Sequence, residues 1–353
     1  MNDLPVEKLI TNITEFFPDY SYWIFDMLND PLLLLDESGM ILFMNEKARK
    51  FYGHSMEEAQ HLHITNLDLN ITVAARYLHT IRRSGDDGYI FLSTHKKKNN
   101  ELVQIQIHAR YIRVPSKNIF ALVIKDISLE RQLRQEFEFA SRIQKNMLPP
   151  HYKSSYIEIR SIYRPYNYVS GDFFDFSWEN NRILHGYVLD IMGHGLATSL
   201  MMSALRVLLS QAFTKQLPLN EKLAWFNQQA IPFLAEDSFA ALIGFSLDFE
   251  KQELTYSMAG INHFLTFKER HPSVIKKPGI FIGLDKKAEY ERHIMPFRSG
   301  DIFCFMTDGL FELLDVPTEF CPRSYAEGYR WLFRAARSPK RRDDVSALCL
   351  HIK

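Results

Sequence analysis

The sequence predicts a two-domain protein of the α+β class, and three patterns support this prediction. Short apolar runs separated by turn residues fill residues 22–127 and again residues 151–353, which is typical of antiparallel sheets. Between them, residues 128–150 have the spacing of a helix that ends at two consecutive prolines. The order of elements favours a small sheet with helices on one face, followed by two packed sheets flanked by helices.

The amino-terminal elements follow from apolar spacing and turn residues. Residues 1–21 are predicted to form a short helix, because apolar side chains recur along one side of it. An acidic turn at 36–39 separates two apolar strands, and Asn45 then opens a helix. The predicted strands of this region are 32–35, 40–44, 89–92, 102–111 and 119–124.

This order of strand, acidic turn, strand, asparagine and helix resembles a PAS sensory domain over residues 22–127. The stretch GHSMEE at 53–58 is similar to the G-x-S-x-E-E segment of that family. Four histidines of this region lack an axial-ligand context, which disfavours haem. Residues 1–150 contain no cysteine, which disfavours flavin photochemistry. The ligand of this domain is unknown from the sequence; a small molecule and a protein partner are both left open.

The helix at 128–150 has a hydrophobic side of heptad character. Leu129, Leu133, Phe137, Ala140 and Met147 share one face, at which Gln144 is a polar interruption. The spacing favours a short coiled-coil seam between two copies of the chain. A helix that packs on its own domain is the alternative.

The carboxy-terminal region alternates strands and helices. Helices are predicted at 196–213 and 220–234. The predicted strands are 157–163, 183–189, 241–247, 254–258, 264–268, 302–306 and 345–350.

Composition excludes several classes of protein. The 353 residues contain 42 Lys and Arg against 42 Asp and Glu, without the basic excess of nucleic-acid-binding domains. No apolar run approaches the length that spans a bilayer, and the first 20 residues lack a signal-peptide pattern. The three cysteines form no CxxC pair, which disfavours a disulfide framework or zinc site and favours the cytoplasm.

The motif DIMGHG at 190–195 carries the strongest indication of chemistry. Its aspartate follows an apolar strand, and its glycines allow the backbone to turn close to a ligand. The carbonyl of Ile191 is a candidate extra metal ligand in such a turn. A plain turn is the alternative when the motif is taken alone.

Three further acidic motifs have the same local setting. Asp172 follows a glycine, Asp308 follows the strand 302–306, and Asp343 and Asp344 precede the last strand. Hard divalent cations such as Mg²⁺ and Mn²⁺ are bound by carboxylates and water. Two such ions could activate a water and hold a phosphate ester for in-line attack. No HExxH, P-loop, GxSxG or kinase motif competes with this interpretation.

Residues 138–353 resemble the sporulation stage II E-type branch of the metal-dependent (PPM) serine/threonine phosphatases. The resemblance runs through ordered segments: an entry helix with the pattern A-x-x-I-Q-x-x-L-L-P at 140–150, then GDFFD at 171–175, DIMGHG at 190–195, TDGL at 307–310 and DDV at 343–345. It implies an α-β-β-α sandwich that binds two Mn²⁺ or Mg²⁺ ions.

Carried over by position, the resemblance implies six metal-site residues. They are Asp172, Asp190, Asp308, the Asp343 and Asp344 pair, and Ile191 through its carbonyl; Asp172, Asp190 and Asp308 are the carboxylates expected to act in catalysis. Asp343 is preferred to Asp344, and His194 is expected to shape the turn rather than bind metal. The family's A-G-H-P appears here as AGINH at 259–263, so its histidine is displaced or absent.

The sequence therefore predicts a PAS-regulated phosphoserine/phosphothreonine protein phosphatase. The resemblance implies a phosphorylated anti-anti-sigma (STAS) protein as substrate, in a stress-response pathway of sigma-factor regulation. A cytoplasmic homodimer is expected, formed by the PAS domain and the helix at 128–150, without nucleic acid or membrane as partner. A non-enzymatic scaffold and an enzyme for a small phosphate ester are the alternatives.

Overall fold

The computed structural model describes residues 25–69, 78–83, 88–113, 118–193, 195–269, 271–314, 322 and 324–353. The chain divides into two compact units, Met1–Glu136 and Phe137–Lys353, whose boundary falls within helix α7 (Ser128–Asn146). The helix predicted for residues 1–21 lies outside the described residues. None of the helices in the described ranges combines the length and apolar character needed to cross a membrane.

The described part of the first unit forms a five-stranded antiparallel sheet of order β2-β1-β5-β4-β3. Alternate residues of its strands are buried, and these pack against short helices on one face. The strands are β1 (Leu32–Leu35), β2 (Ile41–Met44), β3 (Tyr89–Lys96), β4 (Leu102–Ile112) and β5 (Ile119–Asp126). The helices include α3 (Glu46–Tyr52), α4 (Met56–Ala59) and α5 (Ile64–Leu67).

Asn45 fixes the start of helix α3, as the sequence predicts. Its buried side-chain oxygen accepts hydrogen bonds from the Ala48 and Leu32 amides, both at 2.9 Å. Its amide nitrogen donates to the carbonyls of Phe25 and Asp30. Because one side chain caps the helix and also binds strand β1, it holds both elements in register.

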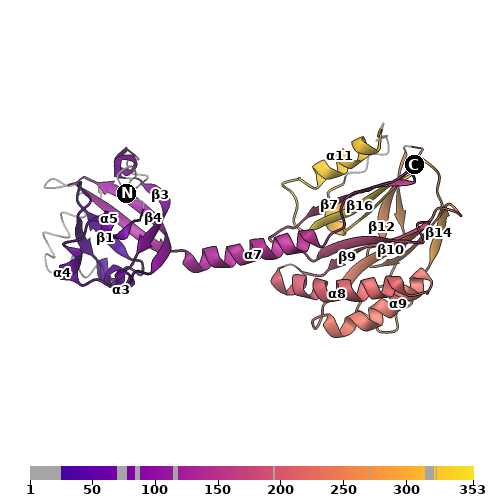
Figure 1. Cartoon of the computed structure of the whole chain (residues 1–353), viewed down its shortest axis with the longest axis horizontal. Coiled ribbons are helices and arrows are strands. Elements are labelled where there is room, and N and C mark those ends of the chain that lie inside the picture. Colours follow the sequence, from indigo (N-terminus) through magenta and orange to yellow (C-terminus); the bar gives the residue numbers. More distant parts are fainter. Residues whose placement is uncertain are drawn as a thin grey trace, which may run out of the picture. The chain divides into compact units, whose positions relative to one another are not determined.

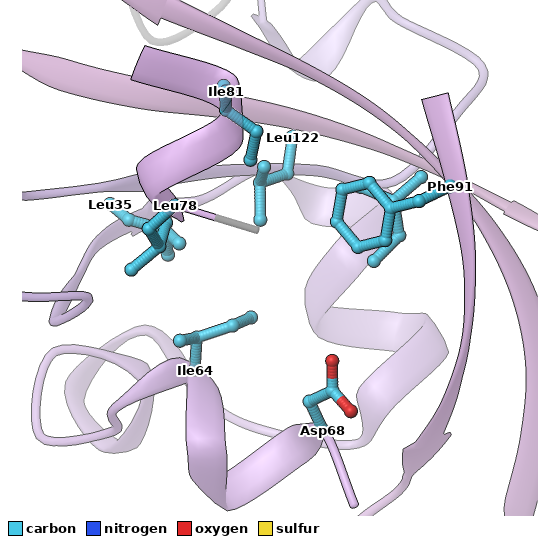
Figure 2. Close-up of a pocket in the computed structure, with 8 residues that line it drawn as sticks. Leu35, Ile64, Asp68, Leu78, Ile81, Phe91 and Leu122 are labelled. Carbon is cyan, nitrogen blue, oxygen red and sulfur yellow. The ribbon is translucent and has the colours of Figure 1, made fainter. Parts of the chain in front are cut away.

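A small cavity of about 20 Å³ lies between the sheet and the helices of this unit. Figure 2 shows the Asp68 carboxylate facing this space, which is otherwise lined by apolar side chains. Asp68 accepts a hydrogen bond from Ser93, and the buried His95 lies 3.6 Å from its other oxygen. The phenol of Tyr52 bonds the opposite nitrogen of the His95 ring at 2.7 Å. The cavity has room for about one water molecule.

Two antiparallel sheets pack face to face in the second unit. The first, of order β14-β11-β10-β9-β8, is made of β8 (Asp172–Glu179), β9 (Ile183–Ile191), β10 (Ala240–Asp248), β11 (Glu253–Ala259) and β14 (His293–Pro296). The second, of order β13-β12-β15-β16-β7-β6, is made of β6 (Tyr152–Lys153), β7 (Ile157–Arg164), β12 (His263–Lys268), β13 (His271–Lys276), β15 (Ile302–Met306) and β16 (Val345–Ile352).

Helices cover both outer faces of this sandwich, as Figure 1 shows. Helices α8 (Leu196–Thr214) and α9 (Leu219–Ala230) pack on the first sheet, and α10 (Asp308–Phe311) and α11 (Tyr325–Ala335) pack on the second. The apolar core between the sheets contains Phe245 and Phe305, whose rings stack at 4.1 Å between centroids. The unit therefore has an α-β-β-α arrangement.

Several elements differ from the sequence predictions. Strand β8 and helix α11 are not among the predicted elements; Gly328 in the middle of α11 is a poor helix former. The predicted helix 220–234 ends at Ala230 and continues as a 3₁₀ turn at Ile231–Phe233. Pro232 explains this change, because it has no amide proton to continue the α-helical pattern.

The Phe245 ring lies over Gly186 on the neighbouring strand of the same sheet, which predicts a cost for adding a methyl group at Gly186. A Cβ there would lie 2.3 Å from the Phe245 ring, on the paired strand β10. We expect Gly186→Ala to lower the free energy of unfolding by about 1–3 kcal/mol, because the stacked rings cannot move apart freely. Chemical denaturation measures this difference.

Gly328→Ala provides the matched control. A Cβ at this helical glycine would meet only ordinary contacts at 3.6 Å and beyond. It should leave stability unchanged or raise it by up to about 1 kcal/mol. Equal effects of the two changes would contradict the packing argument.

Candidate metal centre

The register of strands β8 and β9 brings two of the predicted carboxylates together. Asp172, the first residue of β8, pairs directly with Asp190 near the end of β9. Side chains of directly opposed residues lie on the same face of an antiparallel pair. Phe174 and Val188, two residues further along each strand, belong to the core between the sheets. Both carboxylates therefore point toward the second sheet.

Asp172 is buried and only partly satisfied. Its Oδ2 accepts a hydrogen bond from the Thr307 hydroxyl at 3.0 Å, whereas its buried Oδ1 has no hydrogen-bond partner. Burial raises the pKa of Asp172 well above its ordinary value, and the Asp344 charge raises it further. Such a carboxylate is costly to ionise unless a positive charge compensates it.

The ionised form of Asp190 is also unfavourable. Burial raises its pKa well above the ordinary value, and the charges of Asp172 and Asp308 add to this shift. Asp308 is exposed at the start of helix α10, directly after strand β15. The charges that act on Asp190 come from Asp172 in the first sheet and from Asp308, directly after a strand of the second, so both sheets contribute negative charge to one place.

The residues present fit a divalent cation by the chemistry of their donors. Oxygen atoms of carboxylates are the ligands that Mg²⁺ and Mn²⁺ prefer, and the unpartnered Oδ1 of Asp172 is available for one. Among the described residues, no group of three or more His, Cys, Asp or Glu side chains lies close enough together to hold a metal ion. The fit therefore rests on donor chemistry and charge.

Thr307 ties three strand ends together beside Asp172. Its hydroxyl donates to Asp172 at the start of β8 and accepts from the Ser346 amide of β16 at 3.1 Å. The sequence contains Thr307 within its TDG motif, but the motif alone does not assign the hydroxyl a role. That role depends on a contact between residues 135 positions apart.

The two aspartates at 343 and 344 have different environments. Asp344 is buried, and its two oxygens accept hydrogen bonds from the backbone amides of Tyr166 and Gly171, at 2.6 and 2.8 Å. Asp343 is exposed, and its Oδ1 accepts from the Asp344 amide. Asp344 therefore anchors the loop that leads into Asp172.

Gly309 explains how Asp308 comes near this pair. A Cβ at Gly309 would lie 2.0 Å from the Asp344 carbonyl oxygen and 3.3 Å from the Asp343 Cβ. Only glycine permits so close an approach of two backbones. The glycine of the TDG motif thus lets the backbone directly after Asp308 approach the backbone of Asp343 and Asp344.

The other predicted residues have distinct positions. Ile191 ends strand β9, and its amide donates to the Gly171 carbonyl at 3.3 Å. His194 lies outside the described residues. His263, the displaced histidine, stacks on Phe311 at 3.7 Å between centroids, and burial lowers its pKa to about 4. His263 is therefore held as a neutral ring.

Two stacked sheets with outer helices, and acidic residues at strand ends between them, are the arrangement that the sequence predicts for a domain of the PPM class. Comparison with known proteins agrees with this class. Residues 181–353 match the family model of Stage II sporulation protein E (SpoIIE), and residues 29–129 match a PAS domain model. The chain thus joins a PAS domain to a SpoIIE-type phosphatase domain.

Two individual proteins illustrate the likeness. The phosphoserine phosphatase RsbP of Bacillus subtilis (strain 168) is 23% identical over 195 residues, which are 53% of this chain and 47% of RsbP. The chain therefore spans about half the length of this curated relative. The match to the solved structure of the SiaA-PP2C domain of Pseudomonas aeruginosa covers 64% of this chain and 100% of that domain. The identity is 17% and the TM-score is 0.52, which shows a likeness of fold.

The environment of Asp344 predicts a structural effect of Asp344→Asn. Asparagine keeps one acceptor oxygen but turns an NH₂ group toward the second backbone amide. We expect the free energy of unfolding, measured with EDTA present, to fall by about 1–3 kcal/mol.

Asp343→Asn is the control, because its remaining oxygen can still accept from the Asp344 amide. It should change metal-free stability by less than about 0.5 kcal/mol, as exposed substitutions usually do. A larger loss for Asp343→Asn than for Asp344→Asn would show that the two roles are reversed.

Proposed function

We propose that this protein is a metal-dependent protein serine/threonine phosphatase. The observation that carries the proposal is the in-register pair Asp172 and Asp190, with the unpartnered Asp172 oxygen, at the inner edge of a SpoIIE-type domain. Their raised pKa values reflect a site that favours added positive charge. The RsbP relative, a phosphoserine phosphatase by name, supports the same activity.

The metal ligands in this proposal are Asp172, Asp190, Asp308, Asp343 and the carbonyl of Ile191. Asp344 is assigned a positioning role, because both its oxygens already accept backbone hydrogen bonds. Two Mg²⁺ or Mn²⁺ ions, when bound, supply Lewis-acid polarisation of the phosphate and a water of lowered pKa.

The chain's own residues orient this site. Thr307 fixes one oxygen of Asp172, which leaves the other free to bind. Asp344 holds the Gly171 amide and so sets the start of strand β8. Phe174 and Val188, two residues along from Asp172 and Asp190, belong to the apolar core between the sheets, so this side of the site borders apolar side chains, which strengthens its electrostatic interactions.

We further propose that the substrate is a phosphorylated anti-anti-sigma (STAS) protein of a stress-response pathway, in the cytoplasm. The exposed positions of Asp308 and Asp343 support a protein substrate, because a phosphate on a folded surface can reach them. The PAS domain is assigned the control of activity, through helix α7. A small molecule or protein partner would be its input.

The proposed mechanism predicts the effect of Asp190→Asn and Asp308→Asn. Each change removes a carboxylate charge while keeping the side-chain shape. Loss of a group that only supports a metal ligand lowers activity by about 10–100-fold. Because Asp190 and Asp308 are proposed as ligands themselves, Mn²⁺-dependent release of phosphate from a phosphoserine STAS protein should fall by at least about 100-fold. Phosphate release is measured across a Mn²⁺ titration.

Asp248→Asn, at an exposed hairpin in the same domain, is the control and should retain parental activity. Retained activity in both site variants would refute the mechanism. Binding of the phosphoprotein without any turnover by the parent chain would identify a non-enzymatic scaffold. Turnover of small phosphate esters alone would exclude the protein substrate.

We propose that the chain forms a homodimer through the PAS domain and helix α7. Leu129, Leu133 and Ile143 are exposed, at 69%, 45% and 43%, with spacings of four and ten residues that fit a heptad seam. Phe137, by contrast, stacks on Tyr168 of its own unit. In this proposal Phe137 packs on its own chain, and Leu129, Leu133 and Ile143 contact the second copy.

The dimer predicts a loss of affinity in Leu133→Glu. Each copy would lose a leucine that is exposed in the single chain and buried in the dimer. The dimer should therefore weaken by at least about tenfold, equivalent to about 1.4 kcal/mol. Sedimentation equilibrium of the whole chain measures this change. Gln132→Glu, one position away from the seam, should leave the dimer affinity unchanged. A parent chain that is monomeric at tens of micromolar would refute the dimer.

A further inference from the structure

Helix α7 buries a polar residue and exposes its apolar neighbours. Gln144 is 5% exposed and is the one buried residue of the fully described Ser128–Asn146. Phe139 and Ile143, on the same helix, are 59% and 43% exposed. This is the reverse of ordinary amphipathic packing. The polar interruption of the apolar seam therefore has a specific partner.

That partner is the backbone of Ser170. The Gln144 Nε2 donates to the Ser170 carbonyl at 2.7 Å, and its Oε1 accepts from the Ser170 amide at 3.0 Å. The Tyr163 hydroxyl donates to the same Oε1 at 2.7 Å. Burial raises the pKa of Tyr163, which keeps its phenol protonated as a donor. The amide group of Gln144 is thereby held in one orientation.

Ser170 connects this contact to the metal centre. Its hydroxyl accepts a hydrogen bond from the Asp172 amide at 3.0 Å. The intervening Gly171 donates its amide to Asp344. A continuous set of hydrogen bonds therefore runs from Gln144 through Ser170 to Asp172, whose buried Oδ1 has no hydrogen-bond partner.

We propose that Gln144 is a positioning residue of the metal centre, which sets the backbone of Ser170 to Asp172 and thereby the affinity for divalent cations. This inference rests on the proposed function of the site. Gln144 itself does not contact substrate or metal.

The last turn of helix α7 is held at a second point. Arg206 of α8 donates to the Met147 carbonyl and lies over the Phe173 ring, next to Asp172 in sequence. The end of α7 is thus fixed on both sides of the β8 start. A change in the orientation of α7 would have to move Gln144, Ser170 and Asp172 together.

The test compares Gln144→Leu with Gln132→Leu in the full chain. Gln132 lies on the same helix but bonds only the exposed Glu136. Binding of Mn²⁺ alone is measured by titration calorimetry, and unfolding is measured with EDTA. We expect Gln144→Leu to weaken Mn²⁺ binding by about 10–100-fold, as loss of a supporting group does. Gln132→Leu should match the parent.

Gln144→Glu provides a variant of the same shape. Its carboxylate can accept from Ser170 and Tyr163 but cannot donate to the Ser170 carbonyl, whereas the protonated acid can. The ratio of its Mn²⁺ affinity to that of the parent should therefore rise as pH falls from 8 to 6. A merely structural role would leave this ratio constant.

The outcomes separate this inference from the proposed function. Parental Mn²⁺ affinity in folded Gln144→Leu, or a pH-independent ratio for Gln144→Glu, overturns the positioning role even when the parent is an active phosphatase. A parent that binds Mn²⁺ but releases no phosphate refutes the proposed function alone. If Gln144→Leu does not fold, the pH dependence of Gln144→Glu decides.

Discussion

The site depends on a single constraint, the register between strands β8 and β9. Because side chains alternate along a strand, a shift by one residue would turn Asp172 or Asp190 to the opposite face. The observed register places both carboxylates between the sheets and leaves Phe173 and Leu189 to pack under the outer helices. The apolar packing on both faces of this sheet thus enforces the position of two negative charges that repel one another.

Backbone contacts supply much of what holds these charges in place. Asp344 uses both oxygens on amides of the loop before Asp172, and Thr307 joins the ends of three strands. Gly309 allows the turn after β15 to approach the start of β16. These contacts are made by motifs that are adjacent to the candidate ligands. The short acidic motifs therefore carry both the candidate ligands and the groups that position them.

Helix α7 has two different environments along its length. Toward its start, Leu129 and Leu133 are exposed apolar residues, which suit a second copy of the chain. Near its end, Gln144 is buried on the Ser170 backbone and Phe137 stacks on Tyr168. The own-domain interpretation of its sequence describes the part of the helix that contains Phe137 and Gln144. The coiled-coil interpretation stays a prediction for the part that contains Leu129 and Leu133.

The sequence by itself determined the class of fold, the α7 helix, most strands and the acidic motifs, because apolar periodicity and turn residues are local signals. Local signals did not reveal β8 or α11, whose patterns are weakened by acidic residues and by Gly328. They also do not distinguish the environments of Asp343 and Asp344, which are chemically identical neighbours. Only the tertiary structure shows these two elements, the burial of Asp344, and the hydrogen bonds of Asp344, Thr307 and Gln144. Each of these hydrogen bonds joins residues 26 to 178 positions apart, and such contacts exist only when the strands are paired.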